Sequence, residues 1–350
     1  MQIRMTTSIM KLVGAFAFSL FLPVLAQGQT KPEVDAALKP YQAQGKSLSG
    51  KLQAGSSETL KRLMDLWVEG FVQHHKKVTI ETTLIKYSEA TQAALPDIDP
   101  IPEGAKLLAL SHPISEANLG AIRAKLGVEP VQVPVALDAI VLVVHHRNPL
   151  QGVTLPQIKT IFGAPSNNVV PAPRPWQDYG LNGTLGTRDV NLYGRDTSAG
   201  TFAAFKEMAL QRTEQRSDVH IQPGSMSVVI EVGSDEAGIG YASTGFAVRS
   251  KKVRAVPIAQ KEGDPYISPT NETVVSGAYP LSRKVYLYAM PQADAKLDPS
   301  VKDFILFVLS KDGQRLVKED GFFPLPSHVV EQVLSNLEKN GGMSAGVAAH

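Results

Sequence analysis

Segments typical of β-strands alternate with segments typical of α-helices along most of this chain, and this alternation limits the folds open to it. Runs of β-branched residues predict strands, and apolar residues at helical spacing predict the helices between them. Strands that alternate with helices form an α/β fold with largely parallel sheets and helices on both faces. The expected strands are Val78–Thr83, Lys106–Leu110, Val131–Val144, Val190–Tyr193, Ile239–Ser243, Val253–Ile258 and Lys284–Ala289.

The expected helices fill most of the intervals between these strands and the end of the chain. They begin after Gly55-Ser56-Ser57 and then cover 115–126, 154–162, 201–209, 225–232, 304–309, 315–317 and 329–337. The run Val131–Val144 is long and almost entirely apolar, which suits a buried strand that passes between domains. A chain of 350 residues exceeds the size of most single cores, so we expect two lobes.

Composition excludes several classes of protein. The chain has 35 Lys and Arg against 33 Asp and Glu, a balance that does not suit binding of nucleic acid through its phosphates. Cysteine is absent, which excludes disulfides, iron–sulfur clusters, thiolate zinc sites and cysteine nucleophiles. We expect no nucleic-acid partner and no cofactor.

The first 26 residues are typical of a secretory signal peptide. Arg4 and Lys11 supply the basic region, Leu12–Leu25 is apolar, and a cleavage site lies before Gln27. The alternative is an uncleaved membrane anchor, but the apolar run of about 14 residues is shorter than the roughly 20 needed to span a bilayer. We expect a flexible lead-in over 27–49 and a frayed tail over 341–350.

Three loops share one pattern, in which a strand ends, a hydroxyl-rich turn follows and a helix begins. They are Gly55-Ser56-Ser57, Ser111-His112-Pro113 and Arg195–Thr201. Open α/β sheets bind ligands at the carboxyl ends of their strands, where helix N-termini present unpaired N–H groups. Arg195 adds a bidentate fork for oxyanions, and Gly200 allows close approach of the backbone. The pattern predicts an anion site, although each loop taken alone also suits a simple helix cap.

Other chemistry-bearing patterns are weak. His74-His75 and His145-His146 are adjacent pairs whose side chains diverge, so we expect no metal site. No nucleophile elbow, Walker loop or zinc-protease motif is present, and we expect no catalytic residue. Trp67 and Trp176 suit packing better than ligand stacking.

The sequence resembles the phosphate-binding proteins of ABC transporters over roughly residues 50–330. Gly194–Phe202 is similar to the Arg-Asp-x-Ser-Ser-Gly-Thr segment of that family. Further matching segments follow in the family's order, namely Asn148-Pro149, Leu155–Gly163, Gly238–Ser243, Tyr279–Arg283, Phe304–Ser310, Gly313-Gln314 and Gly321-Phe322.

This resemblance implies a two-lobe periplasmic binding protein fold, with an anion held in the cleft. Lobe 1 would comprise 50–138 plus 286–340, and lobe 2 would comprise 139–285. It implies a non-enzymatic, monomeric periplasmic protein that captures a small oxyanion such as phosphate and delivers it to an ABC transporter permease. The alternatives are an envelope interaction or sensor module that keeps the fold without the ligand and, more remotely, a phosphatase.

The resemblance also implies the ligand-binding residues. They are Ser57, Ser88 and Ser111 in lobe 1, and Arg195, Ser198, Gly200 and Thr201 in lobe 2. This chain departs from the family at four points. Glu58 would repel an anion unless it points away, the segment around Ser88 has no glycine, His112 follows Ser111, and Ala199 replaces a serine. His112 would either donate to an anion when protonated or form part of the cleft wall.

Overall fold

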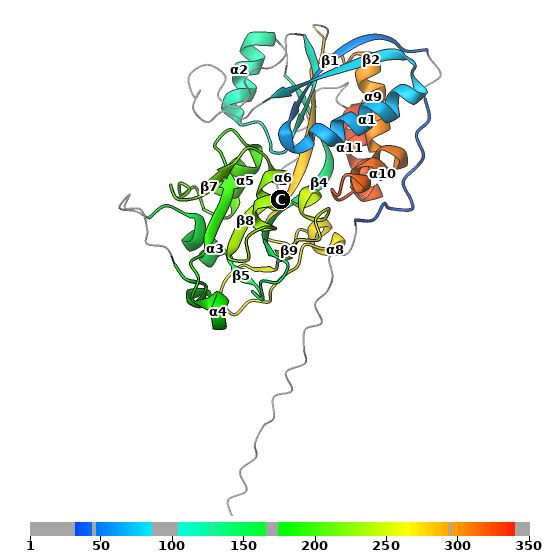
Figure 1. Cartoon of the computed structure of the whole chain (residues 1–350). Coiled ribbons are helices and arrows are strands. Elements are labelled where there is room, and N and C mark those ends of the chain that lie inside the picture. Colours follow the sequence, from blue (N-terminus) through cyan, green and yellow to red (C-terminus); the bar gives the residue numbers. More distant parts are fainter. Residues whose placement is uncertain are drawn as a thin grey trace, which may run out of the picture.

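The computed structural model describes residues 32–43, 47–85, 104–127, 129–165, 174–292, 294 and 296–339. These residues form a two-lobe α/β structure of the periplasmic binding protein type (Figure 1). We call lobe 1 the part that contains β1–β3, α1, α2 and α9–α11, and lobe 2 the part that contains α3–α8 and β5–β10. The expected signal peptide, the tail over 341–350 and Ser88 lie outside the described residues.

One mixed sheet runs through both lobes in the order β2-β1-β3-β11-β4-β8-β6-β7, and β9 also pairs with β4. The pairs of β1 with β2 and β3, and of β6 with β7 and β8, are parallel. The central pairs of β11 with β3 and β4, and of β4 with β8 and β9, are antiparallel. The strands are β1 Ser49–Ser57, β2 Lys77–Ile85, β3 Ala105–Leu110, β4 Val131–His145, β6 Asn191–Arg195, β7 His220–Gln222, β8 Gly238–Ser243, β9 Val253–Val256 and β11 Ser282–Ala289.

Strand β4 belongs to both lobes. Its residues 131–139 pair with β11, and its residues 140–145 pair with β8 and β9. Almost every side chain along it is buried, as its apolar sequence predicts. The strand predicted over Val131–Val144 is therefore confirmed. A separate two-stranded sheet in lobe 2 joins β5 Val153–Thr154 to β10 Ile258–Ala259.

Most helices begin where their sequences predict. Thr154 caps its helix by accepting a hydrogen bond from the Gln157 backbone N–H, and Ser115 accepts one from Asn118 in the same way. The α-helices are α1 Lys61–His74, α2 Glu116–Leu126, α3 Leu155–Phe162, α4 Gly183–Gly186, α5 Gly200–Met208, α6 Ser225–Val232, α7 Thr244–Ala247, α8 Asn271–Val275, α9 Pro299–Leu309, α10 Lys311–Glu319 and α11 Ser327–Lys339. The 3-10 helices are η1 Glu58–Leu60 and η2 Trp176–Tyr179.

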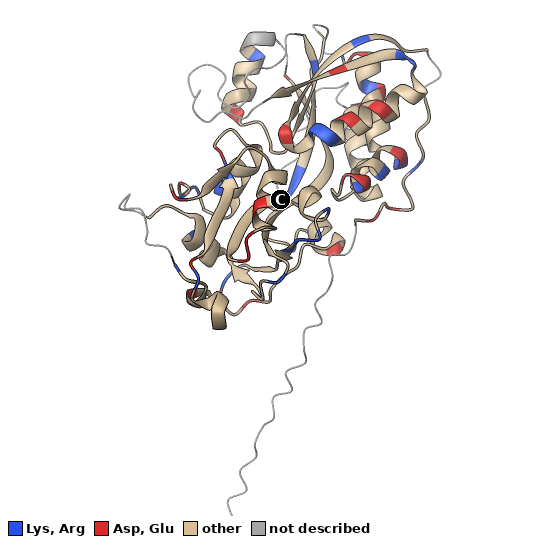
Figure 2. Ribbon diagram, viewed as in Figure 1, with Lys and Arg blue, Asp and Glu red and all other residues tan. Residues whose placement is uncertain are grey.

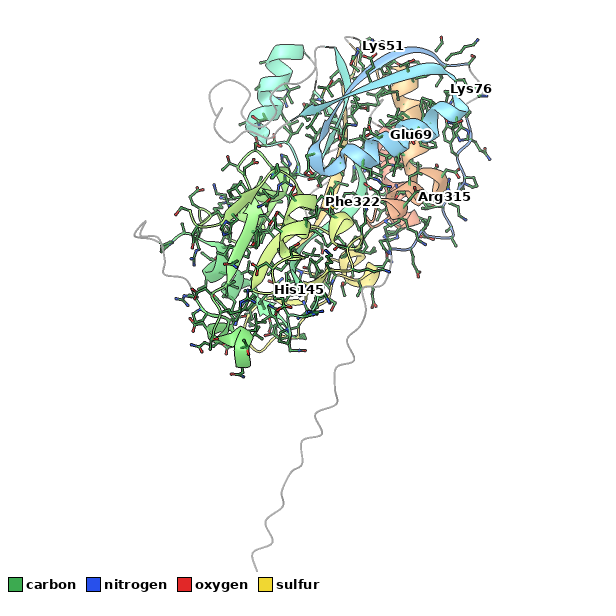
Figure 3. The ribbon with its side chains drawn as sticks, in the orientation of Figure 1. Lys51, Glu69, Lys76, His145, Arg315 and Phe322 are labelled. Carbon is green, nitrogen blue, oxygen red and sulfur yellow. The ribbon has the colours of Figure 1, made fainter. Side chains whose placement is uncertain are left out.

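Each lobe has a large hydrophobic core. Trp67 is fully buried in the core of lobe 1, and Trp176 is fully buried in that of lobe 2. Strand β4 contributes side chains to both cores. Figure 3 shows Phe322, also fully buried, where the two lobes meet. Acidic and basic residues are interspersed in both lobes (Figure 2).

The segment before β1 is more ordered than its polar sequence suggests. Leu38 and Tyr41 are buried in the core of lobe 1, and the Tyr41 hydroxyl donates to Asp303 Oδ2 at 2.6 Å. A strand is expected to end at Gly55-Ser56-Ser57, but its start at Ser49 is not apparent from the sequence, because its first residues are polar and exposed. The expectation of a flexible lead-in over 27–49 is thus wrong for these described residues. Within the described ranges, no helix combines the length and hydrophobicity needed to cross a membrane.

Candidate oxyanion site

A cavity of about 150 Å³ lies between the two lobes. Lobe 1 contributes residues from the ends of β1, β2 and β3 and from η1. Lobe 2 contributes the end of β6, the start of α5 and the turn before α6. The lining residues are Ser57, Glu58, Thr59, Leu84, Ile85, Leu110, His112, Arg195, Asp196, Ser198, Ala199, Gly200 and Pro223. Four of the predicted ligand-binding residues are among them, namely Ser57, Arg195, Ser198 and Gly200.

Arg195 is the cation among the described residues that line this cavity, and its side chain is 3% exposed. Its Nη1 donates to Ser225 Oγ at 3.0 Å, and its Nη2 donates to the carbonyl oxygen of Pro223 at 3.1 Å. Nη1 also donates to Glu58 Oε2 of the opposite lobe at 3.0 Å. Nε is buried and has no hydrogen-bond partner among the described residues. The guanidinium is thus fixed in lobe 2, and its Nε–H is left to bind a ligand.

The loop from Arg195 to Gly200 presents a helix N-terminus to the cavity. Ala199 occupies the N-cap position of α5 and supplies no side-chain hydrogen bond. The first N–H groups of the helix therefore lack an intrahelical partner, and the helix dipole places partial positive charge there. Ser198 donates its hydroxyl to Asp196 Oδ1, which also accepts from the Ser198 backbone N–H at 2.7 Å. The Ser198 hydroxyl proton is thereby committed to Asp196.

The two serines of lobe 1 lie at the ends of neighbouring strands. Ser57 ends β1, and Ser111 directly follows β3. Both Oγ atoms are buried without a hydrogen-bond partner among the described residues. Ser57 occupies the N-cap position of η1, but its side chain does not cap that helix. Of the two, only Ser57 lines the cavity, and its buried hydroxyl without a partner among the described residues suits a site that a ligand completes.

Gly200 is required where α5 meets lobe 1. A Cβ atom at this position would lie 2.7 Å from both Ser111 Oγ and His112 Nδ1. Any larger residue would push the two lobes apart here. Ser111 lies against Gly200, which lines the cavity, but Ser111 does not line the cavity itself.

Thr201, the residue after Gly200, likewise does not line the cavity. Its Oγ1 is 3.1 Å from Thr59 Oγ1 of lobe 1, and it accepts from Arg283 Nη2 at 3.3 Å. The side chain is fully buried. Its hydroxyl thus joins the two lobes in this structure.

Glu58 points into the cavity rather than away from it. Its Oε2 accepts from Arg195, and its Oε1 lies 3.0 Å from where a Cβ on Gly224 would stand. Gly224 is the N-cap of α6. The carboxylate therefore occupies a position between a guanidinium and a helix N-terminus, where an anion is stabilised.

His112 belongs to the wall of the cavity. Burial, with a smaller contribution from the charge of Arg283, lowers its pKa to about 3. The imidazole is therefore neutral at physiological pH. Of the two roles considered for His112, the structure favours the wall over a cationic donor.

The sequence analysis did not identify the ion pair between Asp138 and Arg283, which contacts the start of α5 next to the cavity. Arg283 of β11 donates to Asp138 Oδ2 of β4 from Nε at 3.0 Å and from Nη2 at 2.7 Å. Ser243 Oγ donates to the other carboxylate oxygen at 2.8 Å. Arg283 Nη1 donates to the carbonyl oxygen of Gly200 at 3.2 Å. The sequence signal for this ion pair is Asp138, a single acidic residue within the apolar run Val131–Val144.

The paired histidines do not assemble a metal centre in the described part of the chain, which contains no cluster of three or more metal-ligating side chains. His75 Nε2 lies 3.0 Å from Asp303 Oδ2 and 2.7 Å from the Tyr41 hydroxyl. These contacts tie α1 to α9 and to the segment before β1. The His145 and His146 rings contact each other with their centroids 4.3 Å apart and their planes tilted by 45°.

Comparison with known proteins gives consistent matches. Residues 41–312 match the family model described as a PBP superfamily domain. The chain is 37% identical over 309 residues to the phosphate-binding protein PstS of Pseudomonas aeruginosa, which covers 87% of this chain and 92% of that protein.

Solved structures agree with this match. A possible phosphate-binding protein from Planctomyces limnophilus is 26% identical, with a TM-score of 0.59 over 84% of this chain and 99% of that one. A putative phosphate transporter substrate-binding protein from Clostridium perfringens, solved with bound phosphate, is 24% identical, with a TM-score of 0.60 over 79% of this chain and 100% of that one. The latter comparison supports the fold.

Proposed function

This chain belongs to the PBP superfamily and, within it, to the family of the phosphate-binding proteins, and from that premise we propose that it is a periplasmic solute-binding protein for an ABC transporter. It would hold a small oxyanion such as phosphate between its two lobes. Release of that anion to the permease would follow opening of the cleft.

The observation that carries this proposal is a set of buried donors without partners on both sides of one cavity. Arg195 Nε and the uncapped start of α5 come from lobe 2, and Ser57 Oγ comes from lobe 1. Buried donors in folded proteins are normally satisfied. An oxyanion in the cavity would satisfy them with charge-assisted hydrogen bonds.

Two features weaken the site for inorganic phosphate. Ala199 removes one hydroxyl, and the Ser198 hydroxyl is engaged by Asp196. Each hydrogen bond to a charged group contributes about 1.5–3 kcal/mol, so two losses reduce affinity by a hundredfold or more. We therefore expect weaker phosphate binding than in relatives that retain these hydroxyls.

The remaining parts of the proposal concern location and partners. We propose that residues 1–26 are a cleaved signal peptide, that the mature protein is a periplasmic monomer, and that an ABC permease is its partner. We propose no catalysis and no nucleic-acid partner. We also propose the lobe boundaries expected above, 50–138 plus 286–340 and 139–285. Ser88 stays a predicted ligand residue.

One observation favours the alternative of an envelope module without a ligand. Glu58 of lobe 1 already accepts a hydrogen bond from Arg195 of lobe 2 across the cleft, so the lobes contact each other without an added anion. A protein held shut in this way would not need a ligand to present a closed surface. Failure of the following titration would support this alternative.

The test is a thermal-shift titration of the mature protein, beginning at Gln27, with inorganic phosphate. A ligand at 100 times its Kd adds about 2.7 kcal/mol of stability. We expect phosphate to raise the Tm and Arg195→Ala to abolish the shift. Arg147→Ala is the control, because the Arg147 side chain is 73% exposed and forms a surface ion pair with Glu236. No shift with wild-type protein at millimolar phosphate would contradict the proposal.

A further inference from the structure

Two threonine hydroxyls from opposite lobes meet beside the oxyanion cavity. Thr59 of η1 lines the cavity, whereas Thr201 of α5 is not among its lining residues. Their Oγ1 atoms lie 3.1 Å apart, and this distance alone does not show which hydroxyl donates. Because both side chains are buried, the direction of this hydrogen bond decides which group each proton can reach.

Arg283 fixes the direction of this hydrogen bond. A guanidinium can only donate, and Arg283 Nη2 donates to Thr201 Oγ1 at 3.3 Å. The Thr201 hydroxyl still has its own proton to donate. In the described part of the chain, the acceptor that this proton reaches is Thr59 Oγ1. Buried donors are normally satisfied, so Thr201 donates to Thr59 and not the reverse.

The Thr59 proton then needs another acceptor. Thr59 Oγ1 accepts from Thr201, and the Thr59 side chain makes no other hydrogen bond to a described residue. Thr59 is only 4% exposed, so bulk solvent gives this proton little access to an acceptor. Ser57, two residues earlier, presents a buried hydroxyl of the same kind at the same cavity. An oxyanion between the lobes supplies the acceptor that both protons lack.

Arg283 is itself held where the chain passes between the lobes. It pairs with Asp138 in the register of β4 and β11, and β4 continues into lobe 2 directly after this point. Its Nε and Nη2 donate to the Asp138 carboxylate, and its Nη1 donates to the carbonyl oxygen of Gly200. The guanidinium therefore cannot turn away from Thr201 without breaking a buried ion pair, which is costly.

We propose that Thr59 is a further oxyanion-binding residue, and that Arg283 is a positioning residue that orients the Thr59 proton through Thr201. This inference rests on the proposed function and adds a contact to it. Arg283 donates to Thr201, Thr201 donates to Thr59, and Thr59 donates to the anion. Thr201 thus acts on the ligand through Thr59 rather than by direct contact.

The experiment is isothermal titration calorimetry of the mature protein with inorganic phosphate. Thr59→Val removes the donor at nearly constant size, and we expect it to weaken binding by about tenfold or more, because a hydrogen bond to a charged group is lost. Thr59→Ser keeps the hydroxyl and should restore binding to within about threefold of wild type. Thr59→Ala removes the same donor and gives a second measurement should the valine not fold.

The matched control is Thr160→Val in α3. The Thr160 hydroxyl is exposed and donates to the carbonyl oxygen of Pro156, and neither residue lines the cavity. We expect this variant to bind phosphate as the wild type does. Circular dichroism establishes that each variant is folded before titration.

A pair of double variants tests whether Thr201 and Arg283 act through Thr59. We expect Thr201→Val to weaken phosphate binding by about three- to tenfold in the wild-type background and not at all when Thr59→Val is already present. Arg283→Lys should behave in the same way, because lysine keeps the charge beside Asp138 but lacks the fork that reaches Asp138 and Thr201 together. A purely structural role of Arg283 would weaken binding in both backgrounds.

The outcomes separate this inference from the proposed function. If Thr59→Val binds phosphate as tightly as the wild type, the inference is wrong and the oxyanion function stands. If the wild type itself does not bind phosphate, both are wrong. If Thr201→Val weakens binding by the same factor in both backgrounds, Thr201 acts independently of Thr59 and the proposed order of donors is wrong.

Discussion

Arg195 and Arg283 are both buried and both lie near the start of α5, but their surroundings differ. The carboxylate partner of Arg283, Asp138, is fully enclosed, and it accepts from two nitrogens of the guanidinium. The carboxylate partner of Arg195, Glu58, is 35% exposed, and Arg195 Nε has no partner among the described residues. Arg283 joins β11 to β4, whereas Arg195 joins lobe 2 to a residue across the cavity.

This difference separates an arginine that stabilises the fold from one that is available to a ligand. A fully enclosed ion pair cannot exchange its partner without exposing a buried charge, which is costly. An ion pair that solvent reaches is screened and contributes little by itself, so a ligand can replace or join it. Exposure of the carboxylate, rather than of the arginine, marks the binding site here.

The largest effect should come from breaking the enclosed pair. Asp138→Asn should lower the free energy of unfolding by about 3–5 kcal/mol, because it leaves the Arg283 charge buried without a counterion. Urea denaturation measures this loss. Asp65→Asn is the control, since the exposed Lys61–Asp65 pair should contribute only about 0.3–0.5 kcal/mol. Similar losses in the two variants would remove the distinction between enclosed and exposed pairs.

Two serine variants test the same difference between the enclosed ion pair and the cavity. Ser243 lies beside Asp138, and Ser57 lies in the cavity. Ser243→Ala removes a hydrogen bond to the Asp138 carboxylate and should cost about 1.5–3 kcal/mol of stability. Ser57→Ala removes a buried hydroxyl that has no partner among the described residues, so without ligand it should not lower stability and should raise it by up to about 1–3 kcal/mol. Denaturation of both variants without ligand is the measurement. A large loss for Ser57→Ala would show that this hydroxyl already has a structural role.

The smallest effect near neutral pH should come from His112, which lies against Gly200 and is influenced by the charge of Arg283. Its pKa is about 3 in the folded protein and about 6.5 when unfolded, so below pH 6.5 the unfolded state takes up a proton that the folded state does not. Stability should fall by about 1 kcal/mol between pH 7 and pH 5.5, and it should stop falling only as the pH passes below 3. His112→Gln should remove this component of the pH profile. Unchanged pH dependence in the variant would contradict a buried neutral imidazole.

Much of the fold could be predicted because its signals are local. β-branched runs and hydroxyl caps act within a few residues, and they predicted β4, α3 and the loop from Arg195 to Gly200. Strand β1 could not be read in this way, because its polar start is placed by pairing with β2 and β3 rather than by its own composition.

The site was harder to predict because its partners are distant in sequence. Glu58 and Arg195 are 137 residues apart, and Asp138 and Arg283 are 145 residues apart. Residue types alone indicated that Glu58 would oppose an anion. Only the fold shows that it pairs with Arg195 and that Thr201 bonds to Thr59.

Strand β11 lies between β3 and β4 in the sheet but is synthesised long after both of them. The sheet of lobe 1 therefore cannot be completed until residues 282–289 have left the ribosome. Contacts of such long sequence separation make folding slow. Strands β1, β2 and β3 can pair with one another early, but the facing edges of β3 and β4 wait for β11, so the position of one strand delays closure of the sheet until late in synthesis.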